Sequence, residues 1–268
     1  MAIDTSLILA DQGIVRLAFA GRVRYGLWKR SGKGGRIRLY EGSPFSGGRP
    51  GRSYAPLAQA RLLAPCRPSK VVAVGLNYKA HAREMKKPLP QEPLIFLKPA
   101  SAVIGPGQPV VRPAGSRRVD FEAELAVVIG RRCRRVSPEQ APAYILGYTC
   151  LNDVTERHLQ KKDVQYTRAK GFDTFCPLGP VIAQDLDPHR LRVRSFINQE
   201  PRQDSNTADL IFPIPLLVSF ISQVMTQHPG DVIATGTPAG VGPMRYGDQV
   251  TIEVEGIGRL VNPVKDQD

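Results

Sequence analysis

A mixed, mainly β fold with several short helices, of the α+β class, is what this sequence predicts, and three observations support it. Short apolar runs rich in β-branched residues recur along the chain, and Gly- and Pro-rich stretches separate them. Helical periodicity is confined to brief segments. The 268 residues, 42% of them hydrophobic, contain no internal repeat and no evenly spaced βα units, which argues against a parallel α/β architecture.

The first 68 residues predict a small, basic, β-rich N-terminal domain, followed by a catalytic domain over residues 69–268. The sequence IVRLAFAGRVRYGLW at 14–28 alternates loosely, and we expect Gly21 and Gly26 to break it into short strands. SGKGGR at 31–36 predicts a hairpin-like loop, and GSPFSGGRPGRS at 42–53 predicts irregular chain.

The larger domain predicts a series of strands with two helical segments. The strands are expected in KVVAVGLNY (70–78), PLIFLKP (93–99), FEAELAVVIG (121–130), AYILGYTCLND (143–153), DVIATGTPAGVG (231–242) and QVTIEVEGIGRLVN (249–262). AHAREMKK at 80–87 predicts a short helical or lid-like piece that ends before Pro88, and IPLLVSFISQVM at 214–225 has the apolar spacing of a helix.

Positive charge is concentrated near the N-terminus. The net charge is +13, and residues 1–70 hold thirteen Lys or Arg against three acids, a net +10. Such an excess suits a nucleic-acid patch, or a solvated basic face that attracts anionic metabolites. Aromatic residues make up only 7%, and no known nucleic-acid motif interleaves with the charge. We expect no nucleic-acid partner, and a basic nucleic-acid-binding protein is the non-enzyme alternative.

The sequence also predicts a cytoplasmic protein with no membrane partner. No apolar run approaches the roughly 20 residues that span a bilayer, and no basic leader precedes the first apolar stretch. The four cysteines are scattered without zinc-ligand spacing. We expect buried reduced thiols, with a catalytic cysteine as the alternative.

Three acidic residues in one apolar strand suggest a metal site. Asp120, Glu122 and Glu124 are two residues apart, so in a strand their side chains project from one face. Carboxylates in a buried strand repel one another, and a divalent cation would compensate them, with oxygen ligands favouring Mg²⁺, Mn²⁺ or Ca²⁺. The alternative is a solvated acidic strand end facing the many arginines. Asp153 follows a second apolar strand and is a candidate third ligand, or else the N-cap of a helix.

Other candidates surround these carboxylates in the sequence. His81 and Glu84 are three apart and share a helix face, so the carboxylate can orient the imidazole as a general base, although a surface pair is the alternative. Lys170 precedes a Gly-Phe turn and is either an oxyanion-stabilising group or an ordinary surface lysine. The turn in IATGTPAGVG, with Thr237, can bind an anion through backbone N–H groups but lacks the P-loop pattern.

Taken in order, these segments resemble the fumarylacetoacetate hydrolase family. The resemblance runs from about residue 71 to 264 through VGLNYKAHAREM, EPLIFLKPASAVIGPG, VDFEAELAVVIG, LNDVTERH, AKGFDTFCPLGP, DSNTADLIF, PGDVIATGTPAGVG and GIGRLVNPV. Residues 1–68, with GRVRYG, EGSPF and RLLAPCRPSK, resemble the small domain that precedes the core in many bacterial members.

The resemblance implies a pseudo-symmetric β-sandwich roll, a bound Mg²⁺ or Mn²⁺ and a homodimer. The residues that match the family's functional positions are the metal ligands Glu122, Glu124 and Asp153, the catalytic residues His81, Glu84 and Lys170, and the substrate-binding residues Gln160 and Thr237. Asp120 matches a position behind the ligands. Many members have Asn-Gly in the hairpin after VRSFI, where this chain has Asn198-Gln199, and we expect the turn type to differ there.

The implied substrate is a small anionic keto acid. Metal-stabilised enolate chemistry serves hydrolysis of a carbon–carbon bond in an acylpyruvate or fumarylacetoacetate-like acid, and equally isomerisation or decarboxylation of 2-hydroxydienoates or oxaloacetate-like acids in aromatic-compound degradation. Hydrolysis must deprotonate a water, and His81 with Glu84 supplies a base for it. The sequence therefore favours a hydrolase, with the isomerase or decarboxylase as the alternative.

Overall fold

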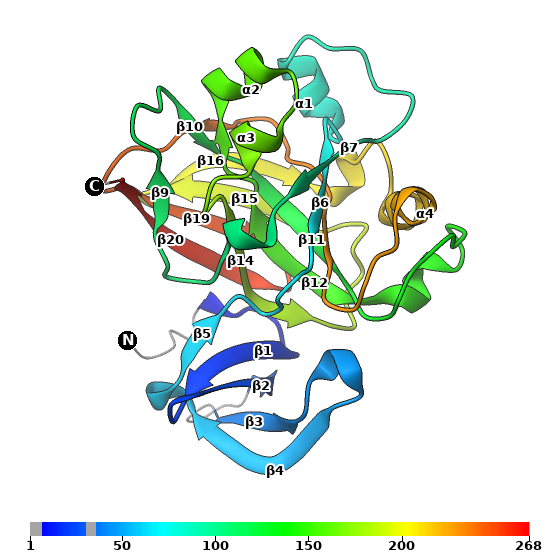
Figure 1. The fold of residues 1–268 in the computed structure, drawn as a ribbon, viewed down its shortest axis with the longest axis vertical. Coiled ribbons are helices and arrows are strands. Elements are labelled where there is room, and N and C mark those ends of the chain that lie inside the picture. The colour runs from blue at the N-terminus through cyan, green and yellow to red at the C-terminus, as the bar shows by residue number, and fades with distance from the viewer. Residues whose placement is uncertain (1–6, 31–35, 268) are drawn as a thin grey trace.

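The computed structural model describes residues 7–30 and 36–267, and it confirms the mainly β fold (Figure 1). Most of the hairpin-like loop expected at 31–36 lies outside the described residues. Figure 1 shows β1 to β5 grouped below the remaining strands, with the helices α1, α2 and α3 together at the opposite end. The candidate residues His81, Glu84, Gln160 and Lys170 belong to these three helices.

The largest sheet has twelve strands and is mostly antiparallel. Its order is β4 (Arg49–Pro56), β3 (Arg36–Glu41), β2 (Arg22–Lys29), β1 (Gln12–Phe19), β14 (Cys176–Ala183), β12 (Ile145–Asn152), β11 (Ala123–Ile129), β17 (Val232–Ala234), β6 (Val71–Gly75) and β7 (Leu94–Lys98), with β5 (Arg61–Leu63) beside β1 and β8 (Val103–Ile104) beside β14. The strands β17 and β6 run parallel, as do β14 and β8.

Two smaller sheets complete the β structure. One contains β16 (Glu200–Asn206), β15 (Arg192–Ile197), β19 (Gln249–Val254), β20 (Gly258–Asp266) and β9 (Val110–Arg112); the other contains β13 (Thr155–Glu156), β10 (Val119–Phe121) and β18 (Gly242–Pro243). The α-helices are α1 (Lys79–Glu84), α2 (Arg157–Asp163), α3 (Thr167–Lys170) and α4 (Ile214–Val224), and the 3-10 turns are η2 (Pro44–Ser46), η3 (Leu57–Gln59), η4 (Ala100–Ala102), η5 (Ala141–Tyr144) and η6 (Thr207–Asp209).

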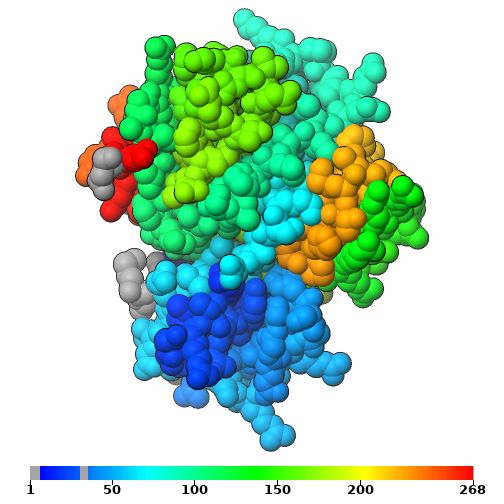
Figure 2. Space-filling view, viewed as in Figure 1, coloured from blue at the N-terminus to red at the C-terminus, as the bar shows by residue number. Residues whose placement is uncertain are grey.

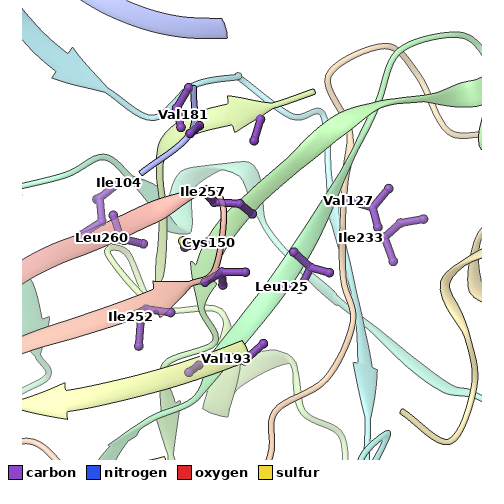
Figure 3. Packing of buried hydrophobic residues seen from close by; sticks show 14 of the residues in the cluster. Ile104, Leu125, Val127, Cys150, Val181, Val193, Ile233, Ile252, Ile257 and Leu260 are labelled. Atoms are coloured by element: carbon purple, nitrogen blue, oxygen red, sulfur yellow. The ribbon is translucent and has the colours of Figure 1, made fainter. Parts of the chain in front are cut away.

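The main core lies between the large sheet and the five-stranded sheet. Figure 3 shows Leu125 of β11, Val193 of β15 and Ile252 of β19 among the side chains that fill this space. The opposite face of the large sheet is covered too, because alternate residues such as Ala126 and Val128 belong to a second buried cluster. All seven residues of β11 are buried, which explains why its sequence reads as a continuous apolar run rather than an alternation.

The N-terminal strands extend the large sheet and do not form a detached sheet. Figures 1 and 2 show them as a blue lobe beneath the rest of the chain, and β1 pairs with β14 at Gly13↔Ala183 and Ile14↔Ile182. The close approach requires glycine at position 13, because a Cβ there would lie 2.5 Å from the carbonyl oxygen of Ile182. The division into domains 1–68 and 69–268 stays a prediction.

Several details of the predicted strands and loops were wrong. The stretch 42–53 was expected to be irregular, but residues 49–53 belong to β4, because Tyr40 and Glu41 of β3 pair with Pro50 and Arg49. Gly26 does not break the N-terminal pattern: it lies inside β2, opposite Val15 and Leu39, where a Cβ would meet Ile37. The Asn198-Gln199 hairpin keeps positive φ at both residues, 52° and 73°, as a type I′ turn requires.

Hydrogen bonds between Asn198 and residues about 50 positions along the chain stabilise this turn. Asn198 donates to Asp248 and accepts from the Gln249 backbone N–H, each at 2.8 Å. These bonds offset the strain at Gln199. None of the four residues lines the catalytic pocket described below.

The helix expected at 214–225 is confirmed as α4, and the lid-like piece at 80–87 contains α1. Within residues 7–30 and 36–267, none of the helices has the length and apolar character that crossing a membrane requires. The four cysteines are free and buried, as expected. Burial raises the pKa of the Cys176 thiol to about 12 and raises the pKa values of Cys66 and Cys150 as well, which disfavours a catalytic thiolate.

Candidate active site

A pocket of about 710 Å³ collects most of the candidate residues beneath α1, α2 and α3. Its walls are partly apolar, with Val74, Leu94, Phe96 and Val241, and its floor is charged. Of the predicted residues the following line it: His81, Glu122, Glu124, Asp153, Gln160, Lys170 and Thr237. Glu84 lies behind His81 and does not line the pocket. A partly apolar cavity of this size with convergent charged groups is typical of a small-molecule site.

Three buried carboxylates meet on the floor of this pocket. The strand expected over 121–130 is interrupted at Glu122, between β10 and β11, while Glu124 lies within β11 and Asp153 follows β12. Pairing of β11 with β12 brings them together, and the Asp153 N–H donates to the Glu122 carbonyl at 2.9 Å. One carboxylate oxygen of each residue lies within 4.8 Å of the others.

Asp120 lies outside this trio. It belongs to β10 of the three-stranded sheet and accepts from Arg118 Nε at 2.8 Å and from Arg157 Nε at 2.8 Å. The second guanidinium also approaches the trio, since Arg157 Nη2 is 2.7 Å from Glu122 Oε1. Asp120 therefore orients Arg157 toward the carboxylates, a position behind the ligands as the resemblance implied.

Two buried lysines neutralise part of the carboxylate charge. Lys170 is 2% exposed, which excludes the surface-lysine alternative, and its Nζ donates to Glu122 at 2.8 Å and to Asp153 at 2.6 Å. Lys98, at the end of β7, is fully buried and donates to the other oxygen of Asp153 at 2.6 Å and to the Lys170 carbonyl at 2.7 Å. The carboxylates are thus unequally compensated.

The unequal charge compensation changes the pKa values of Glu122 and Glu124 in opposite directions. Burial by itself would raise the pKa of Glu122, but the charges of Lys170 and Arg157 outweigh it and lower the pKa to about 2. Burial raises the pKa of Glu124 well above its ordinary range, and the charges of Asp153 and Glu122 raise it further. The Gly236 N–H donates to Glu124 at 2.7 Å, but within the described ranges no Lys, Arg or His forms an ion pair with this carboxylate.

This donor set fits a divalent cation. Three buried carboxylate oxygens lie close enough to share one ion, and Glu124 lacks the cationic partner that its two neighbours have. Hard oxygen ligands suit Mg²⁺ or Mn²⁺ rather than Zn²⁺. The residues Glu122, Glu124 and Asp153 would hold the ion.

The His81–Glu84 pair is fixed on the pocket wall. His81 is 8% exposed, and its Nδ1 lies 2.8 Å from Glu84 Oε2, which leaves Nε2 free of this contact. The other Glu84 oxygen accepts from the Gly240 N–H at 3.1 Å. These contacts link α1 to the Gly-rich turn, so the pair is not an ordinary surface pair. The mobility of this segment stays a prediction.

The backbone N–H groups of the Gly-rich turn donate hydrogen bonds to two of the protein's own carboxylates. Its Gly236 and Gly240 N–H groups bind Glu124 and Glu84. The Thr237 hydroxyl donates to the Ala123 carbonyl at 2.9 Å and accepts from Gln203 Nε2 at 2.8 Å. The Thr237 hydroxyl is therefore bonded within the protein in this arrangement, the residue lines the pocket, and its role in substrate binding stays a prediction.

The geometry around α2 identifies the N-cap of this helix and shows where Gln160 lies. The helix N-cap is Glu156, whose carboxylate accepts from the Leu159 N–H, so Asp153 is not the cap. Gln160 lines the pocket, and its Oε1 accepts from Arg157 Nη1 at 3.0 Å. Gln160 is therefore placed to extend the Arg157 hydrogen-bond network toward a substrate, and this role stays a prediction.

Sequence reasoning missed three contributors: Lys98, Arg157 and Gln203. Gln203 is 1% exposed and accepts from the Ala123 N–H at 3.0 Å while donating to Thr237 and to the Pro238 carbonyl. A lysine at the end of the apolar run LIFLK was the one available signal, because a charge in a buried strand needs a partner. Nothing local marks Arg157 or Gln203.

Comparisons with known proteins give a consistent result. The family described as fumarylacetoacetate (FAA) hydrolase C-terminal matches residues 70–265, and one described as Rv2993c-like, N-terminal matches residues 14–65. A 2-hydroxyhepta-2,4-diene-1,7-dioate isomerase from Mycobacterium marinum superposes with a TM-score of 0.89 at 45% identity, covering 96% of this chain and 99% of that one.

Two other similar proteins differ in activity. A maleylpyruvate hydrolase from Sphingobium sp. SYK-6, solved with manganese(II) and pyruvate, has a TM-score of 0.77 at 32% identity, covering 96% of this chain and 100% of that one. The mitochondrial oxaloacetate tautomerase FAHD2A of Bos taurus is 43% identical over 222 residues, which cover 78% of this chain and 71% of that protein. Similar proteins therefore include a hydrolase, an isomerase and a tautomerase.

Proposed function

Because the chain belongs to the fumarylacetoacetate hydrolase family, we propose that it is a Mg²⁺- or Mn²⁺-dependent hydrolase of acylpyruvate or fumarylacetoacetate-like keto acids. The observation that carries this proposal is the His81–Glu84 pair on the wall of a pocket whose floor holds three buried carboxylates. A metal site alone suffices for enolate chemistry, whereas an oriented imidazole beside it is what a hydrolytic water needs.

Glu122, Glu124 and Asp153 would hold the cation, which would supply Lewis-acid polarisation of the keto-acid oxygens. The maleylpyruvate hydrolase solved with manganese(II) and pyruvate supports both the ion class and an anionic keto-acid ligand. Two cationic side chains add positive charge to the pocket floor, namely Lys170 and Arg157. They offset the negative charge that a keto acid adds there.

Hydrolysis moves a proton and replaces a carbon–carbon bond with a carbon–oxygen bond. His81 Nε2 removes a proton from water while Glu84 stabilises the imidazolium through Nδ1. The water oxygen forms a bond to the distal carbonyl carbon, and the bond from that carbon to the neighbouring methylene breaks. The electron pair leaves with the pyruvate fragment as its enolate, whose carbon takes the proton held by His81. The acid formed from the distal carbonyl releases its own proton, so the products are a carboxylate and pyruvate, and Lys170 stabilises the negative charge that develops.

A second candidate is an isomerase or tautomerase that moves a proton between carbon and oxygen without adding water. The observation that favours it is the higher identity to the Mycobacterium marinum isomerase, 45%, and to the oxaloacetate tautomerase, 43%, than to the hydrolase, 32%. Both candidates use the same carboxylates and the same keto-acid class. They differ in the need for a base that activates water.

The test is a panel of acylpyruvates, oxaloacetate and hydroxydienoates, assayed with Mg²⁺, with Mn²⁺ and with a chelator. We expect His81→Ala to lower kcat for acylpyruvate hydrolysis by about 10²–10⁴-fold, with metal affinity unchanged. Glu84→Gln should lower kcat less, because the imidazole stays in place and loses its orienting charge. His158→Ala, which removes an exposed histidine of α2, is the matched control.

The outcomes separate the candidates. Wild-type hydrolysis by His81→Ala would exclude the pair as the base. Rapid enol–keto interconversion of oxaloacetate by the wild type, with no acylpyruvate cleavage, would instead establish the isomerase or tautomerase. A chelator that leaves every reaction unchanged would contradict the metal dependence of both.

We also propose that the protein is a homodimer. Support comes from apolar side chains around the edge strand β7 and the preceding loop, where Leu97 is 46% exposed and Leu89 is 54% exposed. Apolar groups beside an unpaired strand edge favour association with a second copy. Light scattering should give about twice the monomer mass, 29.4 kDa, and Leu97→Glu should shift it toward the monomer. A monomeric wild type would refute the proposal.

A further inference from the structure

A second cleft, of about 720 Å³, lies where the N-terminal strands meet the rest of the chain, and it shares no lining residue with the catalytic pocket. Its walls come from three segments: β1, the connection between β5 and β6, and the stretch from η4 to β9. The side chains that give it chemical character are Arg16, Arg67, Ser101 and Gln108.

Arg16 projects from β1 toward this junction. It is two residues from Ile14, which is 1% exposed and packs with Leu178 and Ile182 of β14. Residues two apart in a strand share a face, so the Arg16 side chain leaves on the side toward the catalytic domain. Its guanidinium is half-buried, and its single hydrogen bond among residues 7–30 and 36–267 goes to the Ala64 carbonyl at a long 3.4 Å.

A second cation without an acid partner lines the same cleft. Within the described part of the chain, neither Arg67 nor Arg16 forms an ion pair with an acid. Burial lowers the pKa of Arg16 and the Arg67 charge also lowers it, while Tyr25 acts in the opposite direction. Two guanidinium groups that line one cleft without an acid partner favour an anion between them.

A buried acid that bonds Ser69 of this cleft does not fill this role. Asp231 accepts from Ser69 Oγ at 2.7 Å, from Lys70 Nζ at 2.5 Å and from the His228 N–H at 2.8 Å, so both of its oxygens are engaged. Neutral donors are available on the opposite wall. Gln108 accepts from the Gly105 N–H through Oε1 at 2.7 Å, which leaves its amide NH₂ as a donor, and the Ser101 hydroxyl lines the same wall.

We propose that this junction cleft is an anion-binding site, separate from the catalytic pocket, which holds a small dianion between Arg16 and Arg67. Guanidinium forks bind the planar oxygens of carboxylates and the oxygens of phosphates in the same way, so the shared ligand class is a phosphate- or carboxylate-bearing dianion. Gln108 and Ser101 complete the donor set. The site does not depend on which reaction the catalytic pocket performs.

The test uses the full chain in calorimetric titrations with inorganic phosphate and, separately, with succinate, at constant ionic strength and with a chelator present. We expect saturable binding to the wild type and affinity about 10-fold weaker or more in Arg16→Gln and in Arg67→Gln. Arg22→Gln removes the same charge from an exposed position of β2 outside the cleft and should change affinity less than about twofold. The anion that binds more tightly identifies the ligand source.

The design separates this site from other anion binding. Binding in the catalytic pocket survives in Arg16→Gln and is subtracted. If Arg16→Gln does not fold, Arg67→Gln decides alone, because Arg67 is exposed and its loss leaves the core intact. The proposal is overturned if neither anion binds the wild type saturably, if both cleft variants bind as the wild type does, or if Arg22→Gln weakens binding equally.

Discussion

Replacing Glu124 by glutamine separates the two roles that a buried carboxylate can have in the catalytic pocket. A carboxylate that is a metal ligand lowers the stability of the folded protein without metal and raises it once the metal binds. A carboxylate with a structural role raises the stability of the folded protein in both conditions. Glutamine keeps the shape of the side chain, and its amide oxygen can still accept from the Gly236 N–H that donates to Glu124 at 2.7 Å. The substitution therefore changes the charge and little else.

The geometry sets the magnitude. Ligand oxygens of Glu122, Glu124 and Asp153 lie within 4.8 Å of one another, and at that separation two unit charges repel by about 3.5 kcal/mol at an effective dielectric constant of about 20. Glu124 has no paired cation in the described ranges to offset this. Without metal, Glu124→Gln should be as stable as the wild type or up to about 3 kcal/mol more stable.

The assay is thermal unfolding with a chelator and with excess Mg²⁺ or Mn²⁺. At a metal concentration of 100 times Kd the wild type gains about 2.7 kcal/mol, which raises Tm by about 5–11 °C at about 2–4 °C per kcal/mol. Glu124→Gln should lose about 100-fold or more in metal affinity, so its Tm should rise by only about 1 °C at the same concentration.

Asp120→Asn is the matched control, because Asp120 is equally buried but bonds Arg118 and Arg157 and lies outside the trio. It should be less stable than the wild type without metal and should keep the metal-induced rise in Tm. The reasoning is refuted if Glu124→Gln keeps the full metal-induced rise, or if it loses more than about 1 kcal/mol of stability in the chelator.

Two other substitutions test the buried charges. Lys98→Met should destabilise the protein by about 3–5 kcal/mol in chemical denaturation, because it removes a cation from Asp153 and leaves the Lys170 carbonyl without its donor; an effect under about 1 kcal/mol would contradict this reading. Burial opposes ionisation of Asp231, but hydrogen bonds from Lys70 and neighbouring N–H groups prevail and lower its pKa. A carboxyl group with a lowered folded-state pKa contributes stability above its unfolded-state pKa and loses it as pH falls through the folded-state pKa. Asp231→Asn should therefore cost about 2–4 kcal/mol near pH 7, and the gap to the wild type should narrow below about pH 4; a gap that is constant down to pH 2 would count against it.

Much of the fold and part of the site follow from local sequence patterns. Sequence periodicity indicates which faces are buried. It therefore predicts the strands β6, β11 and β12 from their apolar runs and the helix α4 from its apolar spacing. Carboxylates inside the fully buried segment around β11 likewise signal a compensating charge. The pairing of His81 with Glu84 needed only a helical turn to form.

Local patterns misjudge a residue when a distant contact changes its environment. Gly26 reads as a strand breaker, yet a neighbouring strand fills the space where its side chain would be. Gln199 reads as unsuited to a tight turn, yet bonds made by Asn198 to the chain near residue 249 stabilise that turn.

The amino-acid sequence by itself determined the strand-rich fold and the histidine–glutamate pair, because each depends on residues close in the chain or on burial that periodicity reveals. Glu122 and Glu124 followed from their spacing in one strand, whereas the family resemblance indicated Asp153 as the third ligand. Only the tertiary structure decided that Lys98 compensates Asp153, that Gly240 anchors Glu84, and that Arg16 and Arg67 line one cleft. The two residues of each pair are 51 to 156 positions apart. Their partners are set by strand order and sheet packing, which are cooperative properties of the whole chain, so the local sequence around one residue does not identify the other.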